Sequence, residues 1–170
     1  RRSLNNAETK SAAIGAHLVM IGILPTLAEG HMAPSSISAN PRYKLLSEQI
    51  LEARGEDILI DVSGHHERLR TTSDSILPEA ACTSTQFHVQ TSPEDFSDYW
   101  NASQVIAGVQ VALGANSPYL LGKELWRETR IPLFEQATDT RSEELKVQGV
   151  RPRVWFGERW ITSVFDLFEE

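Results

Sequence analysis

The chain has 170 residues, of which 41% are apolar and 23% charged, a composition typical of a soluble globular protein of about one domain. Its 16 Lys and Arg residues against 23 Asp and Glu give a formal charge of −7, and no basic run could follow a phosphate backbone, which argues against nucleic-acid binding. The longest apolar stretch, residues 18–24, is shorter than a membrane span, and no signal pattern precedes it, so we expect a cytoplasmic protein that does not bind membranes. One cysteine, Cys82, excludes an internal disulfide, and we interpret it as a small packing residue.

Apolar periodicity and turn residues predict the elements of the first half of the chain. In order, they are a helix at 4–14, a buried strand at 17–24, a loop at 26–40, a helix at 41–55, a half-buried strand at 57–62 and a polar loop with a short extended piece at 63–75. The second helix has the clearest boundaries, because Asn40 can cap it, Pro41 suits its first turn and Gly55 can end it.

In the second half, residues 80–90 alternate and are rich in Thr, Val and Phe, which predicts a strand. A Ser-Pro-Glu-Asp start at residues 92–95 then predicts a helix that runs to Gly114. Strands and helices mix without a regular βαβ order. We therefore expect an α+β fold, an antiparallel sheet with helices packed on one face, forming a single domain over residues 1–170.

The predicted strand at 80–90 has one polar face. Side chains two residues apart point to the same side of a strand, so Ser84, Gln86, His88 and Gln90 share a face, while Phe87 and Val89 would pack against the helix at 99–113. Oxygen and imidazole groups on such a face could bind a hard divalent cation or a nucleotide. The alternative is the solvated outer face of an edge strand.

Four motifs occur in an order that resembles the glutamate–cysteine ligase family in its plant and proteobacterial forms, within the glutamine-synthetase-like superfamily. They are NPRYKLL at 40–46, TSTQFHVQ at 83–90, ANSPY at 115–119 followed by Gly122, and RIPLF at 130–134. The resemblance implies an antiparallel sheet curved around the site. It also implies an enzyme of glutathione biosynthesis that uses ATP and Mg²⁺ to convert the γ-carboxylate of glutamate into an acyl phosphate, which an amine such as cysteine then attacks.

The resemblance also implies roles for particular residues. It predicts Arg130 as the catalytic residue near the phosphates; Gln86, His88 and Gln90 as nucleotide contacts, with Gln86 and His88 also as metal ligands; and Arg42, Tyr43 and Asn116 as substrate contacts. Alternatives stay open at three positions. Arg130 could form a surface ion pair with Glu128, Arg42 could be paired at its helix start, and Asn116 could shape a turn.

The sequence departs from the family by lacking the Glu-x-Glu strand whose carboxylates are principal metal ligands. We therefore expect an incomplete catalytic domain, an internal piece that is inactive alone and whose exposed sheet edge is covered by the missing part or by another copy. The alternatives in other functional classes are a non-catalytic or regulatory binding module on the same fold and a metal-dependent hydrolase that uses the polar strand face.

Overall fold

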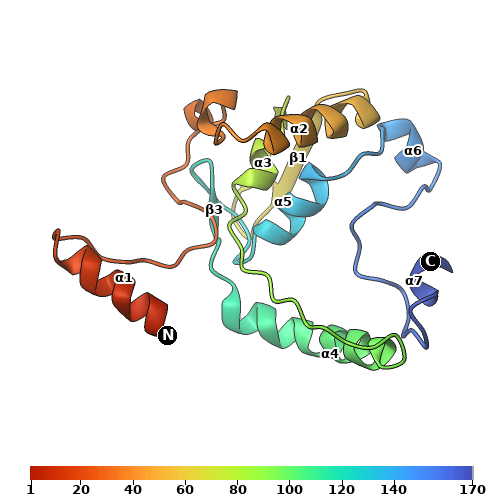
Figure 1. Cartoon of the computed structure of the whole chain (residues 1–170). Coiled ribbons are helices and arrows are strands. Elements are labelled where there is room, and N and C mark those ends of the chain that lie inside the picture. The colour runs from red at the N-terminus through yellow and green to blue at the C-terminus, as the bar shows by residue number, and fades with distance from the viewer. Residues whose placement is uncertain (170) are drawn as a thin grey trace.

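The computed structural model describes residues 1–169 and has the α+β class expected from the sequence (Figure 1). Its elements in chain order are α1 (Arg2–Ala12), the 3₁₀ turns η1 (Glu29–His31) and η2 (Pro34–Ser36), α2 (Pro41–Arg54), β1 (Ile58–Ser63), β2 (Arg68–Ser73), α3 (Leu77–Ala80), α4 (Phe96–Gly114), β3 (Tyr119–Leu120), β4 (Lys123–Glu124), α5 (Arg130–Ala137), α6 (Glu143–Val147) and α7 (Asp166–Glu169). No helix within residues 1–169 combines the length and the apolar character needed to cross a bilayer.

The helices that the sequence predicts are present, and local chemistry explains where they begin and end. At the start of α2 the Asn40 side chain accepts a hydrogen bond of 3.0 Å from the backbone N–H of Arg42, and Pro41 occupies the first turn. Gly55 ends this helix with φ 73°, a left-handed conformation that suits glycine. The helix predicted after residue 92 is also confirmed and begins at Phe96.

Two antiparallel strands form the larger sheet. β1 pairs with β2 in a register that runs from Ile58 opposite Ser73 to Ser63 opposite Arg68, so the strand predicted at 57–62 is confirmed. Alternate residues of β1 are buried because they face the core, whereas most of β2 is polar, which is why the sequence indicated mainly a loop at 63–75. A second, very short antiparallel pair joins β3 and β4.

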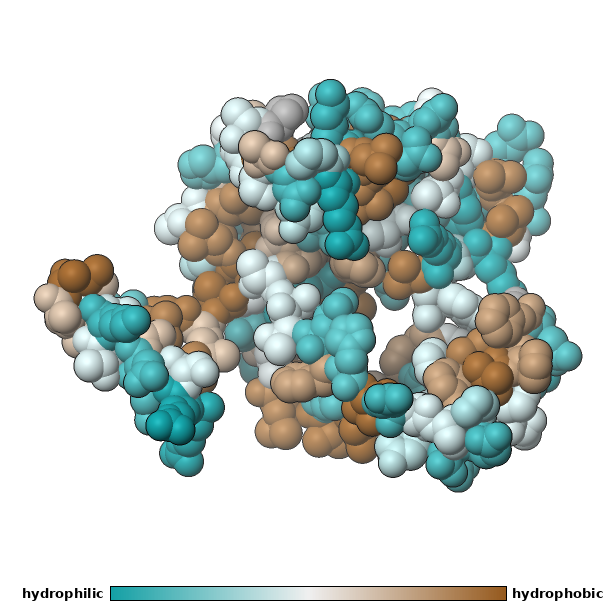
Figure 2. Space-filling view, in the orientation of Figure 1, coloured by the Kyte–Doolittle hydropathy of each residue, from teal (hydrophilic) through white to brown (hydrophobic). Residues whose placement is uncertain are grey.

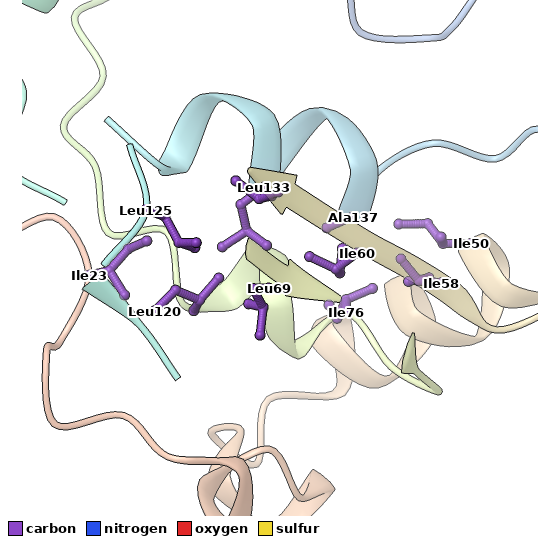
Figure 3. Packing of buried hydrophobic residues seen from close by; sticks show 11 residues of the cluster. Ile23, Ile50, Ile58, Ile60, Leu69, Ile76, Leu120, Leu125, Leu133 and Ala137 are labelled. Atoms are coloured by element: carbon purple, nitrogen blue, oxygen red, sulfur yellow. The ribbon is translucent and has the colours of Figure 1, made fainter. Parts of the chain in front are cut away.

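The core lies where α5 packs on β1, and side chains from several segments converge there (Figure 3). α5 contributes Leu133 and Ala137, which are fully buried. Further buried residues come from the N-terminal segment, α2, the strands and the loops between them, namely Ile23, Ile50, Ile58, Ile60, Val62, Leu69, Ile76, Leu120 and Leu125. The side-chain amide of Gln136 also bonds the backbone N–H and C=O of Asp61 at 2.7 and 3.0 Å, so it occupies part of the open edge of β1.

α4 lies outside this core along most of its length. Ser97 is its buried residue, and its apolar side chains are largely exposed, with Val105 at 66% and Leu113 at 85%. Figure 2 shows apolar surface along this helix, at the bottom of the view. α1 likewise has no buried residue.

Two predicted strands are absent, and these predictions are wrong. Residues 17–24 have no regular structure, and residues 83–91 follow α3 as an irregular segment in which Phe87 is 88% exposed and Val89 is 67% exposed. Neither apolar side chain packs on α4 as predicted. A strand needs a neighbour to pair its backbone groups. Among the described residues, the hydrogen bonds between these two segments all come from Thr83, whose N–H donates to the carbonyl of Gly22 at 3.0 Å and whose hydroxyl contacts the carbonyls of Ile21 and Gly22. The single curved sheet is replaced by two two-stranded sheets.

Candidate functional site

Arg130, the first residue of α5, lies at the centre of a hydrogen-bonded group of residues. Its Nε and Nη2 donate to the two carboxylate oxygens of Glu128 at 2.5 and 2.6 Å, a bidentate ion pair. Nη2 also donates to Oδ1 of Asn116 at 3.0 Å, and Nη1 donates to the backbone carbonyl of Thr83 at 2.8 Å. We call these residues, together with Ser117, the Arg130 cluster.

Two backbone segments run side by side and position this cluster. Ser117 and Glu128 form an isolated parallel bridge, with the N–H of Ser117 donating to the carbonyl of Arg127 at 3.0 Å and the N–H of Thr129 donating to the carbonyl of Ser117 at 3.3 Å. The fully buried hydroxyl of Ser117 donates to Glu128 at 2.6 Å and accepts from the backbone N–H of Arg130 at 3.4 Å. The Glu128 carboxylate therefore has fixed donors on both oxygens.

Gly22 brings the N-terminal segment against the cluster. A Cβ at this position would lie 2.6 Å from Cζ of Arg130 and 2.7 Å from Oδ1 of Asn116, so a glycine is needed for this close approach. The backbone N–H of Gly22 donates to the carbonyl of Asn116 at 3.2 Å, and its carbonyl accepts from the hydroxyl of Thr83 at 2.7 Å.

Glu128 and Arg130 each stabilise the charged form of the other. Burial raises the pKa of the Glu128 carboxyl, but hydrogen bonds from Arg130 and Ser117 outweigh burial and hold the pKa below its ordinary value. The same bond to Glu128 raises the pKa of the Arg130 guanidinium, so the pair is ionised at neutral pH. It is largely withdrawn from water, with Arg130 side chain 23% and Glu128 side chain 8% exposed.

A pocket of about 440 Å³ adjoins this cluster, and we call it the Glu79 pocket. It lies between the turns η1 and η2, the first turn of α2, and α3. Its polar lining includes His31, Tyr43, Glu79 and Cys82. A second pocket of about 740 Å³, which Tyr43 also lines, lies along α2. Both volumes fall in the range of about 300–1,000 Å³ that is usual for small-molecule sites.

Cys82 connects the Glu79 pocket to the Arg130 cluster. Its thiol contacts the backbone carbonyls of Pro78 at 3.5 Å and Arg130 at 4.0 Å, and it packs against the hydrophobic core, in agreement with the packing role predicted for it. Burial raises the pKa of Cys82 to about 12, and the charge of Glu79 adds to this effect. The thiol is therefore not a nucleophile at neutral pH.

The structure brings together some of the predicted site residues. Asn116 and Arg130, from two different motifs, are in direct contact, and Glu128 is the partner that the alternative interpretation of Arg130 named. The backbone carbonyl of Asn116 also accepts a hydrogen bond of 3.2 Å from the N–H of Gly22, and the turn-shaping alternative for its side chain stays a prediction.

Tyr43 lines both pockets, which suits a substrate contact. Arg42, its neighbour, is exposed and is absent from the described lining of the two pockets. The role predicted for each in substrate binding stays a prediction.

Gln86, His88 and Gln90 lie apart from the cluster, exposed on the irregular segment 83–91. The shared strand face on which their assignment depended is not formed, so that geometric argument is wrong, as is the basis for a hydrolase on that face. Within residues 1–169 no group of three or more His, Cys, Asp or Glu could hold a metal ion. The described residues therefore offer no acidic cluster for a magnesium ion, and the metal and nucleotide contacts of Gln86, His88 and Gln90 stay predictions.

The sequence reasoning missed the remaining members of the site. Ser117 and Thr83 lay within recognised motifs, but Thr83 acts through its backbone carbonyl, which a sequence pattern does not reveal. Glu79 had one usable signal in the sequence, because it is an acid directly after three apolar residues, Ile76, Leu77 and Pro78.

Comparison with known proteins gives one match. A family model described as Glutamate-cysteine ligase family 2 (GCS2) matches residues 1–148, which include all four sequence motifs and the whole Arg130 cluster. Neither curated proteins nor solved structures gave a match to the chain.

Proposed function

The chain belongs to glutamate-cysteine ligase family 2, and from this premise we propose that it forms part of an ATP-dependent ligase that joins the γ-carboxylate of glutamate to an amine. In the proposed reaction a carboxylate oxygen attacks the γ-phosphorus of ATP, and the bond to ADP breaks. The amine nitrogen then attacks the acyl carbon of the acyl phosphate, releases inorganic phosphate and loses a proton. Cysteine is the amine in the activity for which the family is named.

The observation that supports this proposal is the Arg130 cluster. Phosphoryl and acyl transfer concentrate negative charge on a few oxygens, and a preorganised guanidinium offsets that charge without reorganising during the reaction. Of the five N–H groups of Arg130, four donate to Glu128, Asn116 and Thr83, and the fifth, on Nη1, has no partner among residues 1–169. We propose that this N–H binds an oxygen of the acyl phosphate or of the transferred phosphoryl group.

The other substrate contacts follow the family assignment. Tyr43, which lines both pockets, and Arg42 are the proposed glutamate contacts, and Gln86, His88 and Gln90 are the proposed nucleotide contacts of this chain. Magnesium accompanies ATP in the proposal. The described residues offer no acidic cluster beside Gln86 and His88 that could hold the metal.

The direct test measures ADP release by the protein that contains this chain, with Mg-ATP, glutamate and cysteine. ADP formation should require glutamate, and sustained turnover should require cysteine as well, with ADP then matching the amount of γ-glutamyl product. Release of ADP without glutamate, or formation of product without ATP, would contradict the proposal. Calorimetric titration with Mg-ATP supplies a readout that does not depend on turnover.

A non-catalytic binding module is the second candidate. It is favoured by the bidentate pairing of Arg130 with Glu128, which neutralises most of the charge that catalysis would use. A module of this kind binds ATP or glutamate in the titration and releases no ADP. The ligase proposal requires turnover, so the two measurements together separate the candidates.

A further inference from the structure

The described lining of the Glu79 pocket includes one carboxylate, that of Glu79. Glu79 and the neighbouring His31 are its ionisable side chains besides Tyr43 and Cys82, and neither Lys nor Arg is among its described lining residues. The rest of the lining is apolar or small, with Met32 among the larger members. An anionic ligand would therefore meet the Glu79 carboxylate without a compensating cation, whereas a cationic ligand would be attracted.

Glu79 itself lacks a partner. Its carboxylate makes no hydrogen bond or ion pair with any part of the chain that the structure describes, although the side chain is partly buried. Burial raises the pKa of this carboxyl, a sign that its charged form has lost solvation without gaining a donor. A ligand that brings donors and a positive charge into the pocket would restore both.

Of the two other polar walls, Tyr43 suits the same ligand. Nδ1 of His31 accepts a hydrogen bond of 3.0 Å from the backbone N–H of Ala28, so Nε2 carries the ring proton and donates, which makes His31 no partner for the ammonium group itself. The aromatic ring of Tyr43 can bind an ammonium group through its face or accept a hydrogen bond through its hydroxyl. The apolar lining, which includes Met32 and Ile37, can take a short carbon chain.

The pocket also lies next to the Arg130 cluster. Cys82 lines the pocket, and its thiol contacts the backbone carbonyl of Arg130 at 4.0 Å. The following residue, Thr83, accepts the hydrogen bond from Nη1 of Arg130, the nitrogen with the unpartnered N–H. The backbone of Thr83 thus links the lining of the pocket, at Cys82, to Nη1 of Arg130, the nitrogen proposed to bind the acyl phosphate.

We propose that the Glu79 pocket binds a small primary amine in its ammonium form, with Glu79 as its counter-ion. This inference rests on the proposed function in one respect, because it assigns the amine as the acceptor of the ligation. The ammonium group must lose a proton before its nitrogen can attack the acyl carbon, and Glu79 supplies the one carboxylate among the described lining residues of the pocket. Glu79 thus binds the amine and receives the proton that the reaction releases.

Binding is tested first, without nucleotide or glutamate. Propylamine, which is protonated at neutral pH, and 1-propanol, which has the same carbon chain without the charge, are titrated into the protein while backbone amide NMR signals of residues 31, 43 and 79 are followed. Propylamine should saturate a site, 1-propanol should not, and Glu79→Gln should weaken propylamine binding at least about tenfold, as the loss of a charged hydrogen bond predicts. The matched control is Glu135→Gln, which removes an exposed acid from α5 and should leave the affinity unchanged.

A second variant protects the test against misfolding of Glu79→Gln. Ser36 is exposed and lines the same pocket, so Ser36→Phe should fill the space and abolish propylamine binding without changing the charge. Equal binding of propylamine and 1-propanol, or full affinity in folded Glu79→Gln, would overturn the proposed amine site.

The role in ligation is tested separately. Glu79→Gln should raise the KM for cysteine about tenfold while the KM for glutamate stays unchanged. An unchanged KM for cysteine in an active enzyme would overturn the acceptor role. If the protein releases no ADP but binds propylamine through Glu79, the ligase function fails and the amine site stands.

Discussion

Arg130 has a planar guanidinium whose bonds to Glu128, Asn116 and Thr83 require separate donors in a fixed geometry. Lysine carries its donors on a single nitrogen and cannot make these three contacts together. We expect Arg130→Lys to lower the free energy of unfolding by about 1–3 kcal/mol, because Glu128 stays buried with fewer partners. Ligation should fall by a factor on the order of 10²–10³ if the guanidinium stabilises developing charge.

Chemical denaturation and steady-state assays of this variant check the two effects. Arg70→Lys is the matched control, since Arg70 is exposed and lies 3.9 Å from Asp61, and it should change neither measurement appreciably. Unchanged turnover with lowered stability would assign Arg130 a structural ion pair alone. Unchanged stability would contradict the hydrogen bonding of the cluster.

Glu128 makes stability depend on acid. Its pKa in the folded chain lies below the ordinary 4.5, despite burial, because Arg130 and Ser117 donate to it. The stabilisation from its ionised form is therefore complete above that ordinary value and is lost as the pH falls through the lowered folded pKa. We expect the free energy of unfolding to decrease as the pH is lowered from about 5 toward 3. Urea denaturation across this range should show a shallower decrease for Glu128→Gln, and an equally steep decrease would assign the acid sensitivity to other groups.

Part of the site could be predicted from residues alone. The motifs singled out Arg130 and Asn116, and Glu128, the acid nearest to Arg130 in the sequence, could be named as its alternative ion-pair partner. The Thr83 carbonyl and the approach of Gly22 could not be predicted, since both depend on how distant segments cross. The wrong placement of Gln86 and His88 followed from one wrong strand.

At the scale of elements, the helices were predictable and two strands were not. Asn40, Pro41 and Gly55 act within a few residues of the helix that they cap, so their effect can be read locally. A strand is stable only when another segment pairs with it. Residues 57–62 have such a partner in β2, whereas residues 17–24 and 80–90 have the composition of strands but pair with no strand in the described chain.

The junction between the N-terminal segment and the Arg130 cluster can be tested at Gly22. Gly22→Ala places a methyl group against a guanidinium that several hydrogen bonds hold in place, so we expect a loss of about 1–3 kcal/mol of unfolding free energy. Gly108→Ala is the control, because Gly108 lies inside α4 with nothing within 4 Å of its Cβ position. That change should be neutral or stabilise α4 by up to about 1 kcal/mol. Equal thermal stability of the two variants would show that Gly22 does not lie against Arg130 in solution.

For the whole molecule, one core joins α2, α3, α5 and the two small sheets, and α1 and α4 lie outside it (Figure 1). The α+β class could be predicted because it depends only on which elements are present. The exposed position of α4 could not be predicted, because its sequence is apolar enough to be buried. Whether such a helix is buried depends on which other elements are available to cover it.

This arrangement predicts uneven protection from hydrogen exchange. Amides of β1 and α5 are held by core packing and should exchange only in large-scale unfolding, whereas α4, which buries one residue, should open nearly independently. We expect exchange in α4 to be faster than in β1 and α5 by at least a factor on the order of 10².

A substitution in the core should affect only the protected elements. Leu133→Ala leaves a cavity in the core and should lower the free energy of unfolding by about 2–5 kcal/mol, so exchange in β1 and α5 should become faster while exchange in α4 stays unaffected. Mass-spectrometric exchange at several protein concentrations measures both effects. Protection of α4 equal to that of β1 would contradict the predicted independence of this helix, and a concentration-dependent rise in that protection would mean that a second copy of the chain covers its apolar side chains.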